Sequence, residues 1–147
     1  MQMPDINVLV YAHREETNEH AHYAAWLTEL ATGLEPFGLS EPVLQGFLRI
    51  VTNPRIFDPP STLDQAFRFI DALVERPGCC LIRPGPGHWR IFRQLCEAGK
   101  LRGKMVADAA HAALAIESGC EWITADTDFA RFSPPLRWRH LSSPHNR

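Results

Sequence analysis

The 147-residue sequence lacks the features that would place it in a membrane or outside the cell. No stretch approaches the ~20 consecutive apolar residues that a membrane-spanning helix needs. The N-terminus does not read as a signal peptide, because Asp5 interrupts the first apolar run almost at once. We therefore expect a cytoplasmic protein with no membrane segment.

The sequence also lacks cysteines at metal-binding spacing and an excess of positive charge. The four cysteines have no Cys-x-x-Cys spacing of the kind that zinc sites use, and we interpret them as small, buried, reduced side chains. The formal net charge is -2, so no overall basic field attracts nucleic acid. Any RNA-binding function must therefore come from local basic groups and from metal ions. The cysteines are Cys79, Cys80, Cys96 and Cys120.

The composition that remains is that of an ordinary globular protein, with 45% hydrophobic and 22% charged residues. The length fits a single domain spanning residues 1–147. Short apolar stretches that read as strands alternate with amphipathic or alanine-rich stretches that read as helices. This alternation predicts an α/β fold with a mainly parallel central sheet. The strands are expected just before Asp5 and over residues 37–39, 79–82, 122–124 and 136–141.

Acidic residues follow several of the predicted strands or open the helices after them. In parallel sheets the ligand site lies beyond the carboxyl ends of the strands, so these side chains are expected to converge there. A single acidic residue in a first helical turn commonly does no more than offset the helix dipole. That explanation is weak for a whole set of acidic residues at one sheet edge. Asp108 is expected in the first turn of the helix 105–118. The set comprises Asp5, Glu41, Asp108, Asp126 and Asp128.

The residue types in this set favour a hard divalent cation. Asp108 lies among alanines, and burying an unpaired carboxylate is unfavourable. No Lys or Arg stands on its own face of the predicted helix, although Lys104 could reach it. Several carboxylates within ~4–6 Å repel one another unless a cation lies among them. Ligands that are all oxygen suit Mg²⁺ or Mn²⁺, which are held by one or two carboxylates together with substrate phosphate. The pattern therefore predicts metal-assisted hydrolysis of a phosphodiester.

Three segments, Asp5–Ala12, Asp108–Ala115 and Thr124–Phe129, resemble in order and spacing the signature segments of PIN-domain nucleases. The segment Ser40–Phe57 is similar to the VapC toxin branch of that family, and the likeness covers essentially the whole chain. The resemblance implies a three-layer α/β/α PIN-like domain and an endoribonuclease that uses Mg²⁺, with Mn²⁺ as the alternative metal. It also implies RNA as substrate, a VapB-type antitoxin as protein partner and a homodimer.

The resemblance further implies roles for individual residues. Asp5 and Asp108 match the metal-holding aspartates, and Asp126 matches the acidic residue after the last core strand, with Asp128 as second choice there. Thr124 matches a frequent hydroxyl residue near the site.

Two further roles come from positions near these motifs. Asn7 is a candidate for orienting Asp5. Many PIN toxins carry an acidic residue immediately before a Leu-Arg pair, where this chain has Phe47, and Glu41 is the candidate for that missing role. The predicted catalytic set is therefore Asp5, Glu41, Asp108 and Asp126, with Asp5 and Asp108 as metal ligands.

Some assignments stay open on the sequence. Five basic residues are candidates for RNA phosphate contacts, with solvated surface charge as an equal alternative. His111 either leans toward the site or packs its own helix. A phosphatase acting on small phosphate esters is a second enzyme class, although no Gly-rich phosphate loop supports nucleotide binding. A catalytically inert RNA- or protein-binding module is the third. The basic residues are Arg49, Arg55, Lys100, Arg102 and Lys104.

Overall fold

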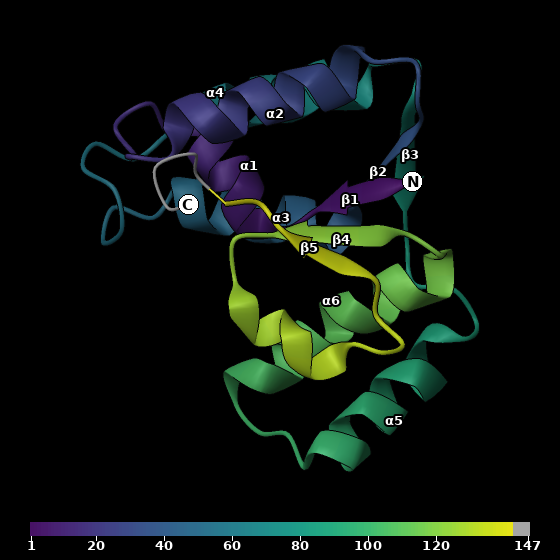
Figure 1. The fold of residues 1–147 in the computed structure, drawn as a ribbon. Helices are drawn as coiled ribbons and strands as arrows, with labels where there is room; N and C mark the ends of the chain where they lie inside the picture. Colours follow the sequence, from purple (N-terminus) through teal and green to yellow (C-terminus); the bar gives the residue numbers. More distant parts are fainter. Residues whose placement is uncertain (143–147) are drawn as a thin grey trace.

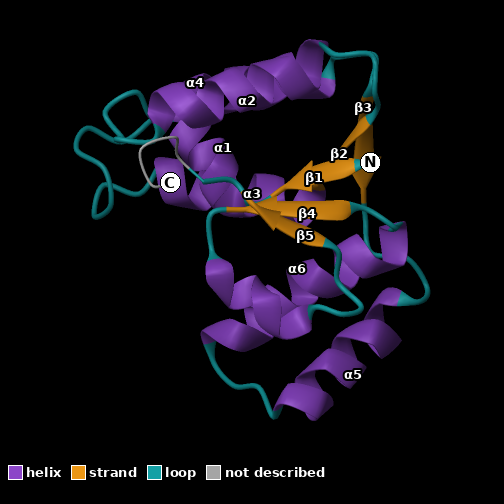
Figure 2. Ribbon diagram, in the orientation of Figure 1, coloured by secondary structure: helices purple, strands orange, loops and turns teal. Residues whose placement is uncertain are grey.

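The computed structural model describes residues 1–142 and is built around a five-stranded sheet (Figures 1 and 2). The strands lie in the order β3-β2-β1-β4-β5, and every neighbouring pair is parallel. The prediction of a parallel α/β sheet is confirmed. The strands are β1 Gln2–Pro4, β2 Phe37–Ser40, β3 Cys79–Ile82, β4 Glu121–Thr124 and β5 Trp138–His140.

Helices cover both faces of this sheet, which gives the expected three layers. Figure 1 shows α1, α2 and α4 on one side and α5, α6 and the short 3₁₀ helix η1 on the other. Helix α3 packs against α1 and α4, and α6 packs against α5 and η1. The helices are α1 Ile6–His13, α2 His20–Thr32, α3 Glu41–Val51, α4 Leu63–Val74, α5 His88–Gly99, α6 Lys104–Ser118 and η1 Thr127–Phe132.

Capping residues visible in the sequence set several helix ends. Ser40 begins α3 by accepting a hydrogen bond from Val43 N at 3.2 Å. Thr62 and Gln65 form a reciprocal capping box that begins α4. Gly119 ends α6 in the left-handed region, with φ of 69°, where a residue with a Cβ would be strained.

The core lies on both faces of the sheet and is largely aliphatic and aromatic. Met3, Phe37 and Trp122 are fully buried strand residues, and Trp122 packs against Phe129 with ring centroids 5.4 Å apart. Each such side chain contributes roughly 1.5–3 kcal/mol by leaving water. Small side chains on the buried face of α6 let that helix lie close to the sheet: Ala109, Ala112, Ala113 and Ala115.

The cysteines are all free, as expected, but they do not share one environment. Cys120 is buried, Cys79 and Cys96 are half-buried, and Cys80 is exposed. The interpretation of the set as buried side chains is therefore right for Cys120 and wrong for Cys80, which lies in the edge strand β3.

Within residues 1–142, no helix combines the length and the apolar character that crossing a bilayer requires.

Candidate active site

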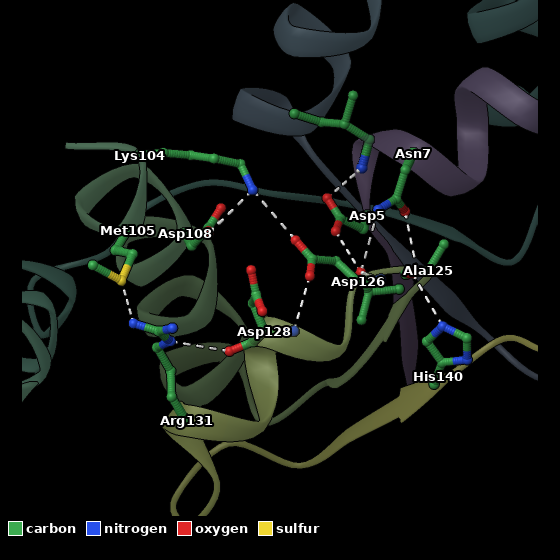
Figure 3. Close-up of polar contacts among 12 residues, drawn as sticks. Asp5, Asn7, Lys104, Met105, Asp108, Ala125, Asp126, Asp128, Arg131 and His140 are labelled. Atoms are coloured by element: carbon green, nitrogen blue, oxygen red, sulfur yellow. Dashed lines mark hydrogen bonds and ion pairs between the residues drawn. The ribbon is translucent and has the colours of Figure 1, made fainter.

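Three carboxylates and two cations line one pocket at the carboxyl edge of the sheet. The pocket has a volume of about 450 Å³. Its acidic residues come from the end of β1, from α6 and from the turn after β4 (Figure 3). The structure thus brings together three of the four residues that the sequence predicted as catalytic. The charged residues of the lining are Asp5, Asp108, Asp126, Arg49 and Lys104.

Asp5 is the most firmly held of the three carboxylates. It caps α1, and its Oδ1 accepts from Ile6 N at 2.6 Å while its Oδ2 accepts from the Thr124 hydroxyl at 2.6 Å. Burial raises the pKa of Asp5 to about 6, the two hydrogen bonds oppose that rise, and the charges of Asp108 and Asp126 add to it. Asp5 is therefore a carboxyl group that titrates just below neutral pH.

Thr124 connects this carboxylate to the turn that carries Asp126. Its Oγ1 donates to Asp5 and accepts from Asp126 N at 3.0 Å and from Asn7 Nδ2 at 3.4 Å. Asn7 Oδ1 accepts from Ala125 N at 3.2 Å. Asn7, the candidate for orienting Asp5, contacts it through Thr124, because it holds Thr124 and the turn.

Lys104 lies between the two remaining carboxylates. Its Nζ is 3.7 Å from Asp108 Oδ2 and 3.4 Å from Asp126 Oδ2 (Figure 3). Burial raises the pKa of Asp108, the Lys104 ammonium opposes that rise, and the charge of Asp126 adds to it. The Lys104 side chain is 73% exposed, so this bridge is well solvated and weak.

The helix that carries Asp108 begins one residue earlier than the sequence predicted. Helix α6 begins at Lys104, so Asp108 lies in its second turn and not in its first. Gly103, with φ of 64° and no capping side chain, precedes the helix. Because Lys104 is itself the first residue of α6, it lies on the same helix face as Asp108, four residues on.

Asp126 and Asp128 were the first and second choices for the acidic residue after the last core strand. Their environments differ. Asp126 lines the pocket, and its Oδ1 accepts from Asp128 N at 2.8 Å at the start of η1. Asp128 is exposed and is not part of the pocket lining. The geometry therefore favours Asp126.

Glu41 is not brought into the pocket. It is the first residue of α3, and its Oε1 accepts from Arg83 Nε at 2.7 Å. Arg83 directly follows β3, which pairs with β2 in the sheet. Phe47, at the position where the family resemblance led us to expect an acidic residue, is fully buried in the core. A catalytic role for Glu41 stays a prediction, and it requires Glu41 to separate from Arg83.

The basic candidates divide into two groups. Arg49 and Lys104 line the pocket, whereas Arg55, Lys100 and Arg102 do not. For His111 both readings hold in part, because its ring stacks on Trp122 with centroids 5.6 Å apart and also lines the pocket. Burial lowers the pKa of His111, so the neutral imidazole is favoured there.

An apolar wall in the same pocket was not predicted from the sequence. Its residues are not contiguous, since they come from α1, from the end of α3 and from the loop after α3. The one signal was an Ile-Phe pair inside an otherwise turn-rich loop. The wall, which we call the apolar wall throughout, comprises Val10, Tyr11, Ile50, Ile56 and Phe57.

The donor chemistry of the pocket suits a hard divalent cation. As the side chains lie, no three His, Cys, Asp or Glu residues among those described are grouped to ligate one ion. Asp5, Asp108 and Asp126 nevertheless face one pocket, and each of the first two has a raised pKa to which the neighbouring carboxylates contribute. A cation among three carboxylates removes that repulsion, and oxygen-only donors favour Mg²⁺ or Mn²⁺.

Comparisons with known proteins give a consistent set of relatives. The PIN domain family matches residues 3–133 of the chain. Ribonuclease VapC43 of Mycobacterium tuberculosis is 48% identical over 136 residues, which cover 92% of each chain. Ribonuclease VapC31 of the same species is 36% identical over 144 residues, which cover 98% of this chain and 99% of that one. The solved structure of VapBC2 from Rickettsia felis, bound to a promoter DNA fragment, shares the fold with a TM-score of 0.69 at 20% identity and covers 95% of this chain and 97% of its own.

Proposed function

We propose that this chain, which belongs to the PIN domain family in its VapC ribonuclease branch, is a metal-dependent endoribonuclease acting as the toxin of a toxin–antitoxin pair. The observation that carries the proposal is the single pocket that Asp5, Asp108 and Asp126 line. The near-complete alignment with relatives named ribonuclease supports RNA as the substrate.

Asp5 and Asp108 are the residues proposed to hold the metal ion, with Asp126 beside them. Bound Mg²⁺ or Mn²⁺ supplies Lewis-acid activation of the attacking water and offsets the charge that grows on the phosphate. Asp5 contributes a carboxylate whose orientation is fixed in advance by Ile6 and Thr124. Asp108 contributes one whose present partner, Lys104, is exposed and readily displaced.

Lys104 and Arg49 are proposed to contact RNA phosphates. Both line the pocket that holds the carboxylates, and both are exposed. Phosphate contacts from lysine and arginine fix the register of a nucleic acid on a protein. These two local cations therefore account for the binding of a polyanion by a chain whose net charge is -2.

Glu41 is retained as the proposed fourth acidic residue of the reaction. It begins α3 at the carboxyl end of β2, and β2 pairs directly with β1, the strand that leads to Asp5. The Arg83 side chain that holds it is 67% exposed, so the ion pair opens at little energetic cost.

A VapB-type antitoxin partner and a homodimer are part of the same proposal. The support is family membership together with the shared fold of a VapBC complex. Co-expression with a candidate VapB-type protein, followed by copurification and a cleavage assay, tests the partner. The antitoxin is expected to bind and to suppress RNA cleavage.

A catalytically inert binding module is the second candidate function. The ion pair between Glu41 and Arg83 and the absence, among the described residues, of a preformed group of metal ligands favour it. Incubating the purified protein with labelled RNA, with and without Mg²⁺ or Mn²⁺, separates the two. Cuts that EDTA stops support the nuclease. RNA that is bound but left uncut supports the inert module. Hydrolysis of small phosphate esters alone supports a phosphatase.

A further inference from the structure

The apolar wall has no part in the metal chemistry proposed for the carboxylates. It belongs to the same pocket as Asp5 and Asp108, so any ligand bound at the carboxylates lies beside it. Ile56 is 52% exposed, so the apolar wall is open to solvent at this residue. An apolar surface that is continuous with a charged site is typical of a pocket for a ligand with both characters.

The loop that carries Ile56 and Phe57 is held in shape by its own backbone hydrogen bonds. It joins α3 to α4, and the backbone N–H groups of Ile56 and Phe57 both donate to Asn53 O at 3.0 Å. At the far end of the loop, Ser61 N donates to Val51 O at 2.8 Å. The side chains of Ile56 and Phe57 therefore extend from a loop whose two ends are both fixed by backbone hydrogen bonds.

Arg14 holds Phe57 in place. Its guanidinium carbon lies 4.4 Å from the centroid of the Phe57 ring. The same guanidinium donates to Pro59 O at 2.9 Å and to Ser61 Oγ at 3.1 Å, and the Arg14 side chain is only 12% exposed. One face of the ring is thus occupied by a fixed cation, while Phe57 also contributes to the pocket lining.

We propose that the apolar wall is a subsite for an unpaired nucleobase next to the phosphate that lies at the carboxylates, with Phe57 as its stacking residue. This inference rests on the proposed ribonuclease function. Proteins that bind single-stranded nucleic acid stack the bases on aromatic side chains and track the backbone with positive charge. Phe57 supplies the aromatic surface here, and Arg49 and Lys104 supply the positive charge in the same pocket.

The charges of the pocket favour RNA over an apolar protein segment as occupant. Two cations share the pocket with the apolar wall, and three carboxylates there can hold a divalent ion. A nucleotide matches this combination, because its base suits the apolar wall and its anionic phosphate suits both the two cations and the divalent ion. The pocket volume of about 450 Å³ lies within the usual range of about 300–1,000 Å³ for ligand sites.

A binding experiment without catalysis tests the subsite. A short single-stranded RNA carrying 2-aminopurine is titrated with the wild-type protein in EDTA, so that no cleavage occurs. Stacking on Phe57 is expected to quench the fluorescence. Phe57→Leu, which keeps an apolar side chain against Arg14, is expected to lose the quenching and to weaken binding about tenfold or more. Phe57→Trp is expected to restore both.

Phe67→Leu is the matched control, because Phe67 is a 46% exposed aromatic on α4 outside the pocket. It is expected to bind and quench as the wild type does. Equal quenching and affinity in Phe57→Leu and wild type would overturn the proposal. So would a Phe57→Leu variant that binds RNA normally and loses affinity for its protein partner alone.

Mapping of cleavage sites supplies a second readout that depends on the proposed function. Wild-type protein is expected to prefer certain bases beside the cut, and Phe57→Leu to lose that preference with a raised KM and a nearly unchanged kcat. If wild-type protein cuts no RNA yet quenches and binds as described, the ribonuclease proposal fails while the base subsite stands. If it cuts RNA with the same preference and KM in both forms, the subsite fails while the ribonuclease stands.

Discussion

The hydroxyl of Thr124 donates a hydrogen bond of 2.6 Å to Asp5 Oδ2, joining residues 119 positions apart in the sequence. The bond links the end of β4 to the residue that follows β1, at the edge of the sheet where the carboxylates meet. The same oxygen accepts from Asp126 N and Asn7 Nδ2, so one hydroxyl fixes two of the three acidic residues.

Thr124→Val keeps the shape of this side chain and removes its hydroxyl. Two donors then lose their acceptor and Asp5 loses a donor in a buried setting, which is expected to lower the free energy of unfolding by about 1–3 kcal/mol. RNA cleavage is expected to fall with it. Urea denaturation and a cleavage assay measure the two effects. Thr124→Ser is the control, and its stability and cleavage rate should stay near those of the wild type. Equal stability and cleavage in Thr124→Val and Thr124→Ser would show that the hydroxyl has no such role.

The raised pKa of Asp5 predicts how stability depends on pH without metal. A carboxyl group whose folded pKa exceeds its unfolded value stabilises the fold at low pH, and that contribution is lost as pH rises through the folded value of about 6. Between about pH 4 and 7 the loss is on the order of 3 kcal/mol. His13 and His111, whose pKa values are lowered by burial, act in the opposite direction.

The comparison that isolates this effect is wild type against Asp5→Asn, unfolded with urea in EDTA at several pH values. The difference in unfolding free energy between the two proteins should shift in favour of the variant as pH rises. A difference that stays constant from pH 4 to 7 would mean that Asp5 titrates at an ordinary value in the folded protein.

Metal binding is expected to stabilise the protein more at pH 7.5 than at pH 5.5, because the ion competes with protons for Asp5 and Asp108. A metal concentration of 100 times Kd adds about 2.7 kcal/mol of stability. Thermal unfolding with Mn²⁺ or Mg²⁺ measures the shift in Tm. Asp108→Asn should abolish it, whereas Asp71→Asn, an exposed acidic residue on α4, should retain it. A full shift in Asp108→Asn would place the metal elsewhere.

The position of Lys104 predicts that removing its charge affects the binding of metal and of RNA in opposite directions. Its ammonium lies between Asp108 and Asp126, so Lys104→Met should tighten Mn²⁺ binding, by about twofold to fivefold for an exposed bridge. The same variant should weaken RNA binding and reduce its salt dependence by about one charge. Calorimetry and salt titration measure these. Lys100→Met, outside the pocket, is the control. Weaker Mn²⁺ binding in Lys104→Met would contradict the assignment.

The ion pair between Glu41 and Arg83 makes the role of Glu41 testable with two variants. If Glu41 acts in the reaction, Glu41→Gln should lower kcat by about 100-fold or more, the usual contribution of an acid–base group. Arg83→Gln, which frees the carboxylate, should keep or raise kcat. Full activity in Glu41→Gln would leave this residue only a surface ion pair, worth about 0–1 kcal/mol.

Most of the fold and much of the site could be predicted because their signals are local. Asp5 and Asp126 each lie just after a strand, and a parallel sheet brings such positions to one edge. Ser40 and Gly119 mark helix ends through their own capping chemistry. The start of α6 was predicted one residue late because Gly103 precedes the helix without a capping side chain to mark the start.

The features that escaped prediction depend on pairings between distant segments. Glu41 and Arg83 follow Ser40 and Ile82, which are partners in the sheet, so their ion pair comes from strand register and not from sequence spacing. The apolar wall likewise gathers residues from α1, α3 and the loop after α3. Nothing in the residues around Phe57 shows that Arg14 holds its ring.

Cleavage of a labelled RNA by wild type and by Asp108→Asn, each with Mn²⁺ or Mg²⁺ and with EDTA, tests the central claim most directly. Thermal unfolding of both proteins first confirms that the variant is folded. Wild type is expected to cut internally only when metal is present, and Asp108→Asn to be slower on the order of 100-fold or more. A folded Asp108→Asn variant that cuts at the wild-type rate, or wild-type cleavage that EDTA leaves undiminished, would contradict the account.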